Sequence, residues 1–173
     1  MKILGTGMSG VALALSDTEC LKIYPTRASE YSYRQETRPE LLRTLKRLDP
    51  NQRYFVYARP CKPPEIPNLW EIYGRYMNGI ARRGKLVQMK DYKLQLRRAA
   101  KFPRMEPLGE VSREDLDHLA EALDMLHGAG WTHRDLHPEN VMRGEDSLPR
   151  IIDWGEAEKS VDTDPDWNSL DEF

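Results

Sequence analysis

The sequence is poor in cysteine and has no long apolar run. Its 173 residues contain two cysteines, Cys20 and Cys61, whose spacing fits neither a metal-binding pair nor a disulfide framework. The apolar runs are too short to cross a bilayer, and the stretch after Met1 is too short for a secretory signal. These absences predict a cytoplasmic protein with reduced thiols and no membrane partner.

Charge of one sign is nearly missing from two segments. Residues 81–105 hold nine basic side chains and one acid, whereas residues 153–173 hold eight acids and one lysine. Three interpretations stay open: two solvated patches, an acidic tail laid across a basic helix, and nucleic-acid binding by the basic segment. Nucleic acid is disfavoured because that segment has few aromatic residues, Tyr92 and Phe102.

Short segments near the N-terminus predict an antiparallel sheet. We expect strands over residues 1–4, 11–15 and 19–24, with a glycine-rich turn after the first. Further strands are expected over residues 53–58 and 69–77, separated by a proline-rich loop. A hinge near Asn78-Gly79 follows.

Helices are expected later in the chain. Pro39 suits the first turn of a helix with a leucine stripe that ends at Leu48, and residues 89–100 carry apolar side chains at helical spacing. Ser112 begins a capping signal for a third helix. Short strands over residues 140–142 and 150–152 complete an α+β pattern, with strands first and helices later.

Three motifs near the C-terminus resemble the catalytic core of protein kinases: His133-Arg134-Asp135, Asn140 and Asp153-Trp154-Gly155. The resemblance covers nearly the whole chain, from Gly5 to about Ala157. It implies a bilobal protein-kinase-like fold with a β-rich N-lobe (about 1–78) and a reduced, mainly helical C-lobe (about 79–157). Residues 158–173 would form an acidic C-terminal tail.

The resemblance implies ATP and Mg²⁺ as cofactors. Asp135 would act as the catalytic base or orient the substrate hydroxyl, and Asn140 and Asp153 would be the Mg²⁺ ligands. We include His137 among the catalytic candidates and assign His133 a structural role. Alternation of His133, Asp135 and His137 also resembles a zinc site, but the kinase motif accounts for these residues better.

The other side of the cleft would be supplied by the N-terminal sheet. The phosphates would be covered by a glycine loop containing Gly5, Gly7 and Gly10. Lys22 would reach the phosphates, held by a carboxylate of the first helix. Glu40 is the first choice for that carboxylate, and Glu36 is the alternative.

The chain departs from the family pattern in three ways. His137 replaces the lysine usual in serine/threonine kinases and is typical of small-molecule phosphotransferases. Trp154 replaces phenylalanine. The sequence ends 20 residues after Asp153, without an Ala-Pro-Glu signature, so we expect no platform for protein substrates and no phosphorylated partner for Arg134.

Three functions therefore compete. The first is a serine/threonine protein kinase, similar to the reduced kinases of bacteriophages and large viruses, which would work in the host cytoplasm. The second is a small-molecule kinase, and the third is a pseudokinase or regulatory binding module. A short C-lobe is expected to leave apolar surface uncovered, which suggests a homodimer as a further partner. The series Asp162, Asp164 and Asp166 lacks the glycine and the final acid of a calcium loop.

Overall fold

The protein folds as two compact units in a computed structural model that describes residues 2–7, 10–24, 27–64 and 98–173. The first unit comprises Met1–Arg34 and Ala58–Arg104, and the second comprises Gln35–Tyr57 and Met105–Phe173. Residues 158–173 belong to the second unit. The expected lobe boundary near residue 78 lies outside the described residues. Strands dominate the first unit and helices the second, so the α+β prediction is confirmed.

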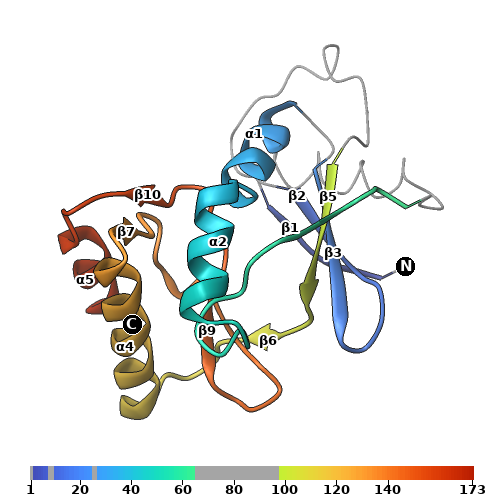
Figure 1. The fold of residues 1–173 in the computed structure, drawn as a ribbon. Coiled ribbons are helices and arrows are strands. Elements are labelled where there is room, and N and C mark those ends of the chain that lie inside the picture. Colours follow the sequence, from blue (N-terminus) through green and yellow to red (C-terminus); the bar gives the residue numbers. More distant parts are fainter. Residues whose placement is uncertain (1, 8–9, 25–26, 65–97) are drawn as a thin grey trace, which may run out of the picture. The chain divides into compact units, whose positions relative to one another are not determined.

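A five-stranded antiparallel sheet forms the first unit (Figure 1). Its strands, in spatial order, are β1 (Ile3–Gly7), β2 (Gly10–Ala14), β3 (Glu19–Tyr24), β5 (Arg98–Pro103) and β4 (Arg59–Cys61). The three N-terminal strands are present as predicted, but β1 begins and ends later than residues 1–4 and contains Gly5 and Gly7, which we had placed in a turn; β3 has the predicted bounds. Val11, Leu13, Leu21 and Ile23 are buried, so the alternating pattern of β2 and β3 gives this sheet its core.

Strand β5 corrects the helix expected over residues 89–100. It pairs with β3 on one side, from Glu19↔Pro103 to Tyr24↔Arg98, and with β4 on the other. Hydrogen bonding on both edges and complete burial of Ala99 and Ala100 override the helix propensity of alanine. The remainder of that helix, the strand over 69–77 and the hinge near residue 78 lie outside the described residues.

Two further elements of the first unit were not predicted. Helix α1 (Arg27–Glu36) lacks a leucine stripe and is joined to the sheet through Tyr33, whose ring meets Tyr24 at 5.1 Å. Strand β4 contains Pro60, which we had placed in a loop. Proline is tolerated there because β4 is the edge strand of the described sheet.

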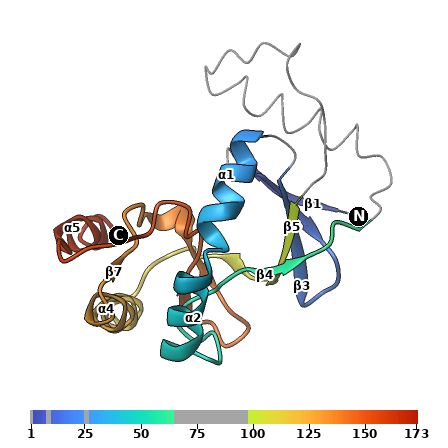
Figure 2. The same cartoon turned by 45° about the horizontal axis from the view of Figure 1, so that its top comes forward.

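The second unit is built on helices α2 (Pro39–Leu48), α4 (Arg113–Gly128) and α5 (Asp164–Leu170). Helices α2 and α4 follow the predicted stripes, and Ser112 caps α4 by accepting the Asp115 N–H at 3.1 Å. Helices α4 and α5 lie side by side (Figure 2). In the described ranges, no helix is both long and apolar enough to span a bilayer.

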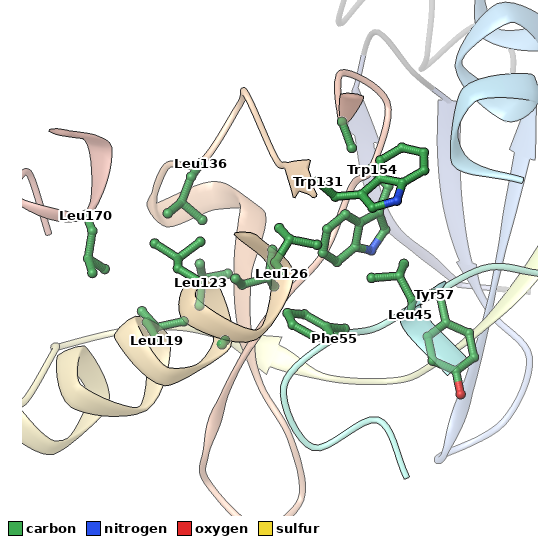
Figure 3. Close-up of a cluster of buried hydrophobic side chains, with 14 of the residues drawn as sticks. Leu45, Phe55, Tyr57, Leu119, Leu123, Leu126, Trp131, Leu136, Trp154 and Leu170 are labelled. Carbon is green, nitrogen blue, oxygen red and sulfur yellow. The ribbon is translucent and has the colours of Figure 1, made fainter. Parts of the chain in front are cut away.

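Buried side chains from all three helices and from the loops between them form one cluster (Figure 3). Leu45, Leu119, Leu123 and Leu126 are fully buried in it. Short strands bound the cluster: β7 (Trp131–Thr132) pairs with β10 (Glu158–Lys159), and β8 (Val141–Arg143) lies between β6 (Glu106–Pro107) and β9 (Pro149–Ile151). The predicted strands at residues 140–142 and 150–152 are thus present with shifted bounds.

The strand expected over residues 53–58 is largely wrong. Phe55 alone in that segment forms a bridge, with Ile151. The buried carboxylate of Asp49 accepts the N–H groups of Arg53, Tyr54 and Phe55 at 2.9, 2.6 and 2.9 Å. This capture bends the chain tightly after α2 and prevents a regular ladder.

Candidate active site

The loop that carries the first motif runs from β7 to β8 and is anchored by His133. This imidazole is fully buried: Nδ1 accepts the Asp135 N–H at 3.3 Å, and Nε2 donates to the Ile152 carbonyl at 2.9 Å. Burial lowers the pKa of His133, so the ring is neutral. Both nitrogens are used within the fold, which agrees with a structural role.

Asp135, His137 and Asn140 meet around one amide group. Asn140 Nδ2 lies 2.8 Å from the Asp135 carbonyl oxygen, 3.0 Å from the Asp135 carboxylate and 3.0 Å from His137 Nε2. Because both Asp135 atoms are oxygens that accept hydrogen bonds, the Asn140 amide must turn its nitrogen toward them. Its oxygen then points away from Asp135. The Asn140 amide nitrogen thus lies within hydrogen-bonding distance of three polar atoms from Asp135 and His137.

Asp153 lies close to Asn140 because β8, which follows Asn140, is paired with β9, which precedes Asp153. Val141 of β8 pairs with Ile151 of β9, and the Ile152 N–H donates to the Asn140 carbonyl at 2.9 Å. Asp153 then adopts φ 59°, a left-handed angle that is uncommon outside glycine. A Cβ at Gly155 would lie 3.4 Å from Asp153 Oδ1, at ordinary van der Waals distance.

Trp154, which lies between Asp153 and Gly155 in the sequence, is part of the core. It is 1% exposed, its ring meets Phe55 at 5.6 Å and His133 at 5.0 Å, and its Nε1 donates to the Val56 carbonyl at 2.6 Å. The indole therefore supplies a hydrogen bond that phenylalanine could not make.

Arg134 has carboxylate partners from the segment that follows Asp153. Its guanidinium lies 2.6 Å from the carboxylate of Glu158 and 3.3 Å from that of Asp162, and it also contacts the Ser160 hydroxyl at 3.4 Å. These carboxylates raise the pKa of Arg134 through hydrogen bonding, which keeps the guanidinium charged. Residues 158–162, from β10 toward α5, thus fix a residue next to Asp135.

Sequence reasoning missed Asp166 as a residue that holds the loop. Its carboxylate is completely buried and accepts the N–H groups of His133 and Arg134 at 2.7 and 2.8 Å, together with His127 Nε2 at 2.9 Å. Arg134 has φ 70°, and these bonds hold that left-handed turn. Pro165 beside two acids is a helix-start signal that could have placed Asp166 on a helix.

In the first unit, Lys22 and the glycine loop lie on neighbouring strands. Lys22 of β3 pairs with Ala12 of β2, and its ammonium lies 5.5 Å from the Tyr24 ring centre. Gly10 is required sterically, because a Cβ there would come within 2.5 Å of the Ile23 carbonyl oxygen, and its φ is 153°. Gly5 has open space around it, so its value would be freedom near a ligand. Gly7 ends β1 and pairs with Gly10.

The two candidate carboxylates differ in burial. Glu36, the last residue of α1, is 1% exposed, whereas Glu40, in the first turn of α2, is exposed. A buried carboxylate ordinarily has a charged or hydrogen-bonding partner, and an exposed one at a helix start is already stabilised by water and the helix dipole. The two candidates thus differ in burial, and the choice between them stays a prediction.

The donor set near Asn140 fits a hard cation such as Mg²⁺. Asn140 Oδ1 and the Asp153 carboxylate are oxygen donors of the kind Mg²⁺ prefers, and Mg²⁺ commonly takes only one or two protein ligands beside phosphates and water. No group of three or more histidine, cysteine or acidic side chains able to hold a metal occurs in the described part of the chain. Both ring nitrogens of His133 are used within the fold, which disfavours a zinc site at His133, Asp135 and His137.

Comparison with known proteins identifies the family. A family model described as "Phosphotransferase enzyme family" matches residues 40–160. The chain belongs to this family. The match contains α2, the loop from His133 to Asn140, Asp153 and the partners of Arg134 up to Ser160.

Curated relatives of this phosphotransferase family member include protein kinases. It is 38% identical over 85 residues to ribosomal protein S6 kinase alpha-2 of Mus musculus, covering 47% of this chain and 11% of that protein. The serine/threonine-protein kinase AfsK of Streptomyces coelicolor is 59% identical over 39 residues, 22% of this chain and 5% of the relative. The chain thus spans about a tenth or less of these relatives.

Proposed function

We propose that this family member transfers the γ-phosphoryl group of ATP to a hydroxyl group, with a serine or threonine of a protein as acceptor. The arrangement around Asn140 carries the proposal. One amide donates to the Asp135 carboxylate at 3.0 Å, and in this proposal its oxygen shares a cation with the Asp153 carboxylate. An acceptor for the hydroxyl proton would then lie beside the oxygens that hold the metal.

In this proposal Asp135 orients the acceptor hydroxyl and takes its proton. Its side chain is about half exposed, with a relative exposure of 50%, so an acceptor can approach it. Asn140 and Asp153 would hold Mg²⁺, which when bound neutralises charge on the transferred phosphoryl group. His137 Nε2 lies 3.8 Å from the Asp135 carboxylate and would contact the acceptor or the phosphoryl oxygens.

Lys22 and the glycine loop would position the nucleotide phosphates. A cation on a strand beside backbone N–H groups freed by Gly5, Gly7 and Gly10 suits a polyphosphate. We propose Glu36 rather than Glu40 as the carboxylate that holds Lys22, because Glu36 is the buried one. Burial strengthens an ion pair electrostatically and makes its loss costly.

Two observations bear on the acceptor. The relatives named above are protein kinases, which supports a protein acceptor. His137, where serine/threonine kinases have lysine, supports a small molecule as the second candidate. A binding module without activity is the third candidate, and its support is weaker because Asp135, Asn140 and Asp153 are all in place.

Labelled ATP tests the proposal directly. Wild-type protein with Mg²⁺ should transfer label to proteins of a whole-cell lysate, whereas Asp135→Ala should transfer about 100- to 10,000-fold less and still bind ATP. Glu139→Gln, which alters an exposed acid of the same loop, is the matched control and should retain activity. Label in the small-molecule fraction alone would select the second candidate. Mg·ATP binding without any transfer would refute both enzyme candidates.

A further inference from the structure

Arg38 contacts three segments that surround the candidate site in the second unit. It lies between α1 and α2, directly before Pro39. Its Nε donates to the Gln35 carbonyl at 2.9 Å, its Nη2 donates to the Ala157 carbonyl, and its guanidinium lies over the Trp131 ring at 5.3 Å. One side chain thus joins the end of α1, the approach to the loop of His133 and the segment after Asp153.

Each contacted segment carries or leads to a candidate site residue. Gln35 directly precedes the buried Glu36, and Trp131 lies two residues before His133. Ala157 follows Asp153 by four residues and is itself 2% exposed. In Figure 1 the chain that enters β10 passes beside the junction of α1 and α2, where Arg38 makes this connection.

The chemistry of these contacts requires arginine. A guanidinium has N–H groups that point in several fixed directions and a flat face that stacks on aromatic rings. It can therefore donate to two carbonyls on different segments while covering the indole of Trp131. A lysine ammonium could keep the charge near the ring, but it could not reproduce both hydrogen bonds in this geometry. Helix α2 gains no side-chain cap from Arg38, so helix capping does not explain the residue.

We propose that Arg38 is a positioning residue that fixes the end of α1, with Glu36, relative to the segment from Asp153 to Ala157. This inference rests on the proposed function, because it concerns the alignment of Glu36 with the metal-binding side of the site. When Arg38 is lost, the two segments can shift independently. Phosphoryl transfer then slows, while nucleotide binding by the remaining groups is largely kept.

Kinetics and hydrogen exchange test the proposal together. Arg38→Met keeps the aliphatic stem but removes the donors. Its kcat should fall about tenfold or more, with KM for ATP within about threefold of wild type. The kcat of Arg38→Lys should lie between that of the wild type and that of Arg38→Met. Arg34→Met is the matched control on α1, where Arg34 has a 70% exposed side chain; its kcat should stay within about twofold of wild type.

Hydrogen exchange provides a readout that does not need activity. In Arg38→Met, amides of residues 35–38 and 154–160 should exchange at least about fivefold faster, while those of α4 should not change. Equal acceleration in α4 would show general destabilisation and overturn the proposal. Unchanged exchange in both segments, or faster exchange with wild-type kcat, would also overturn it. If the wild-type protein transfers no phosphoryl group, the proposed function fails, and the exchange result alone decides the role of Arg38.

Discussion

Arg134 and Asp153 show how individual residues in the second unit accept unfavourable backbone angles. Their φ values of 70° and 59° are left-handed, which costs of the order of 1 kcal/mol for residues other than glycine. At Arg134 the cost is offset by the buried carboxylate of Asp166, which accepts two consecutive N–H groups. The residues next to Asp135 are therefore held in place before any substrate arrives.

The choice between Glu36 and Glu40 gives a prediction at this scale. Glu36→Gln removes the charge of a buried carboxylate, and we expect kcat/KM for ATP to fall about tenfold or more because Lys22 loses its proposed partner. Glu40→Gln is isosteric in the same way, lies on the exposed start of α2 and should change kcat/KM less than about twofold. Steady-state kinetics on both variants measures the difference. A larger loss in Glu40→Gln would restore the original choice.

Site residues that lie close in sequence could be predicted, and those brought in by tertiary structure could not. Asp135 and Asn140 share one loop, and Asp153 follows the strand paired with the end of that loop, so local order placed them. Asp166 and Arg38 act through backbone N–H and carbonyl groups of distant segments. Such groups leave no pattern in the sequence, which is why neither residue was found.

Helices and strands followed the same rule: those set by local sequence were predictable, and those set by neighbouring elements were not. Helix α4 was predictable because its capping box and its apolar stripe are local. Strand β5 was not, because two neighbouring strands determine its conformation and its own residues favour a helix. Helices α1 and α5 have no leucine stripe, and their contacts include the ring pair of Tyr33 with Tyr24 and the hydrogen bond of His127 with Asp166.

Arg143 joins strand β8 to the start of helix α4 and the loop before it. Its guanidinium donates to both carboxylate oxygens of Asp115 at 2.8 Å and to the carbonyls of Leu108, Glu110 and Ser147. Hydrogen bonding by Arg143 is the largest cause that holds the pKa of Asp115 well below its usual range. The Asp115 side chain is 10% exposed, so the pair is poorly screened by water.

A prediction about pH follows from this pair. Because the pKa of Asp115 is lower in the folded state, its contribution to the free energy of unfolding is present above the ordinary value of 3.8 and is lost as the pH falls below it. We expect Arg143→Met to cost about 2–4 kcal/mol at pH 7. Urea unfolding at pH 5 and pH 3 should show a smaller pH-dependent loss in Arg143→Met than in wild type. Equal losses would contradict the pairing.

At the scale of the whole molecule, the described basic residues of segment 81–105 have partners close to them, and little apolar surface is exposed in the described part of the second unit. Arg98, Lys101 and Arg104 pair with acids of the first unit, Glu30, Glu19 and Asp17. Among described residues, Val161 is the one large apolar side chain of the second unit that is highly exposed. The uncovered apolar surface that motivated a homodimer is therefore not found in the described part, and the dimer itself stays a prediction.

Residues 158–173 give the prediction that concerns the fold of the second unit. They supply a β-strand, a helix, the partners of Arg134 and the buried Asp166, with Leu170 in the core (Figure 3). Deletion of these residues should remove about 3 kcal/mol or more of stability and leave the backbone amides of His133 and Arg134 without their acceptor. We expect thermal unfolding to show a large loss of stability in the deletion variant, together with lost phosphoryl transfer.

Two point variants test whether the loop is held by the buried carboxylate of Asp166 or only by the presence of residues 158–173 as a whole. Asp166→Asn keeps the shape but weakens the acceptor of three donors, and it should lower both the melting temperature and kcat because the loop next to Asp135 loses its anchor. Asp164→Asn removes an equal charge from an exposed position in the same helical turn and should change neither beyond a small helix-dipole effect. If Asp166→Asn behaves like Asp164→Asn, the loop is held by its other contacts. Residues 158–173 would then matter for packing and not for the geometry of Asp135.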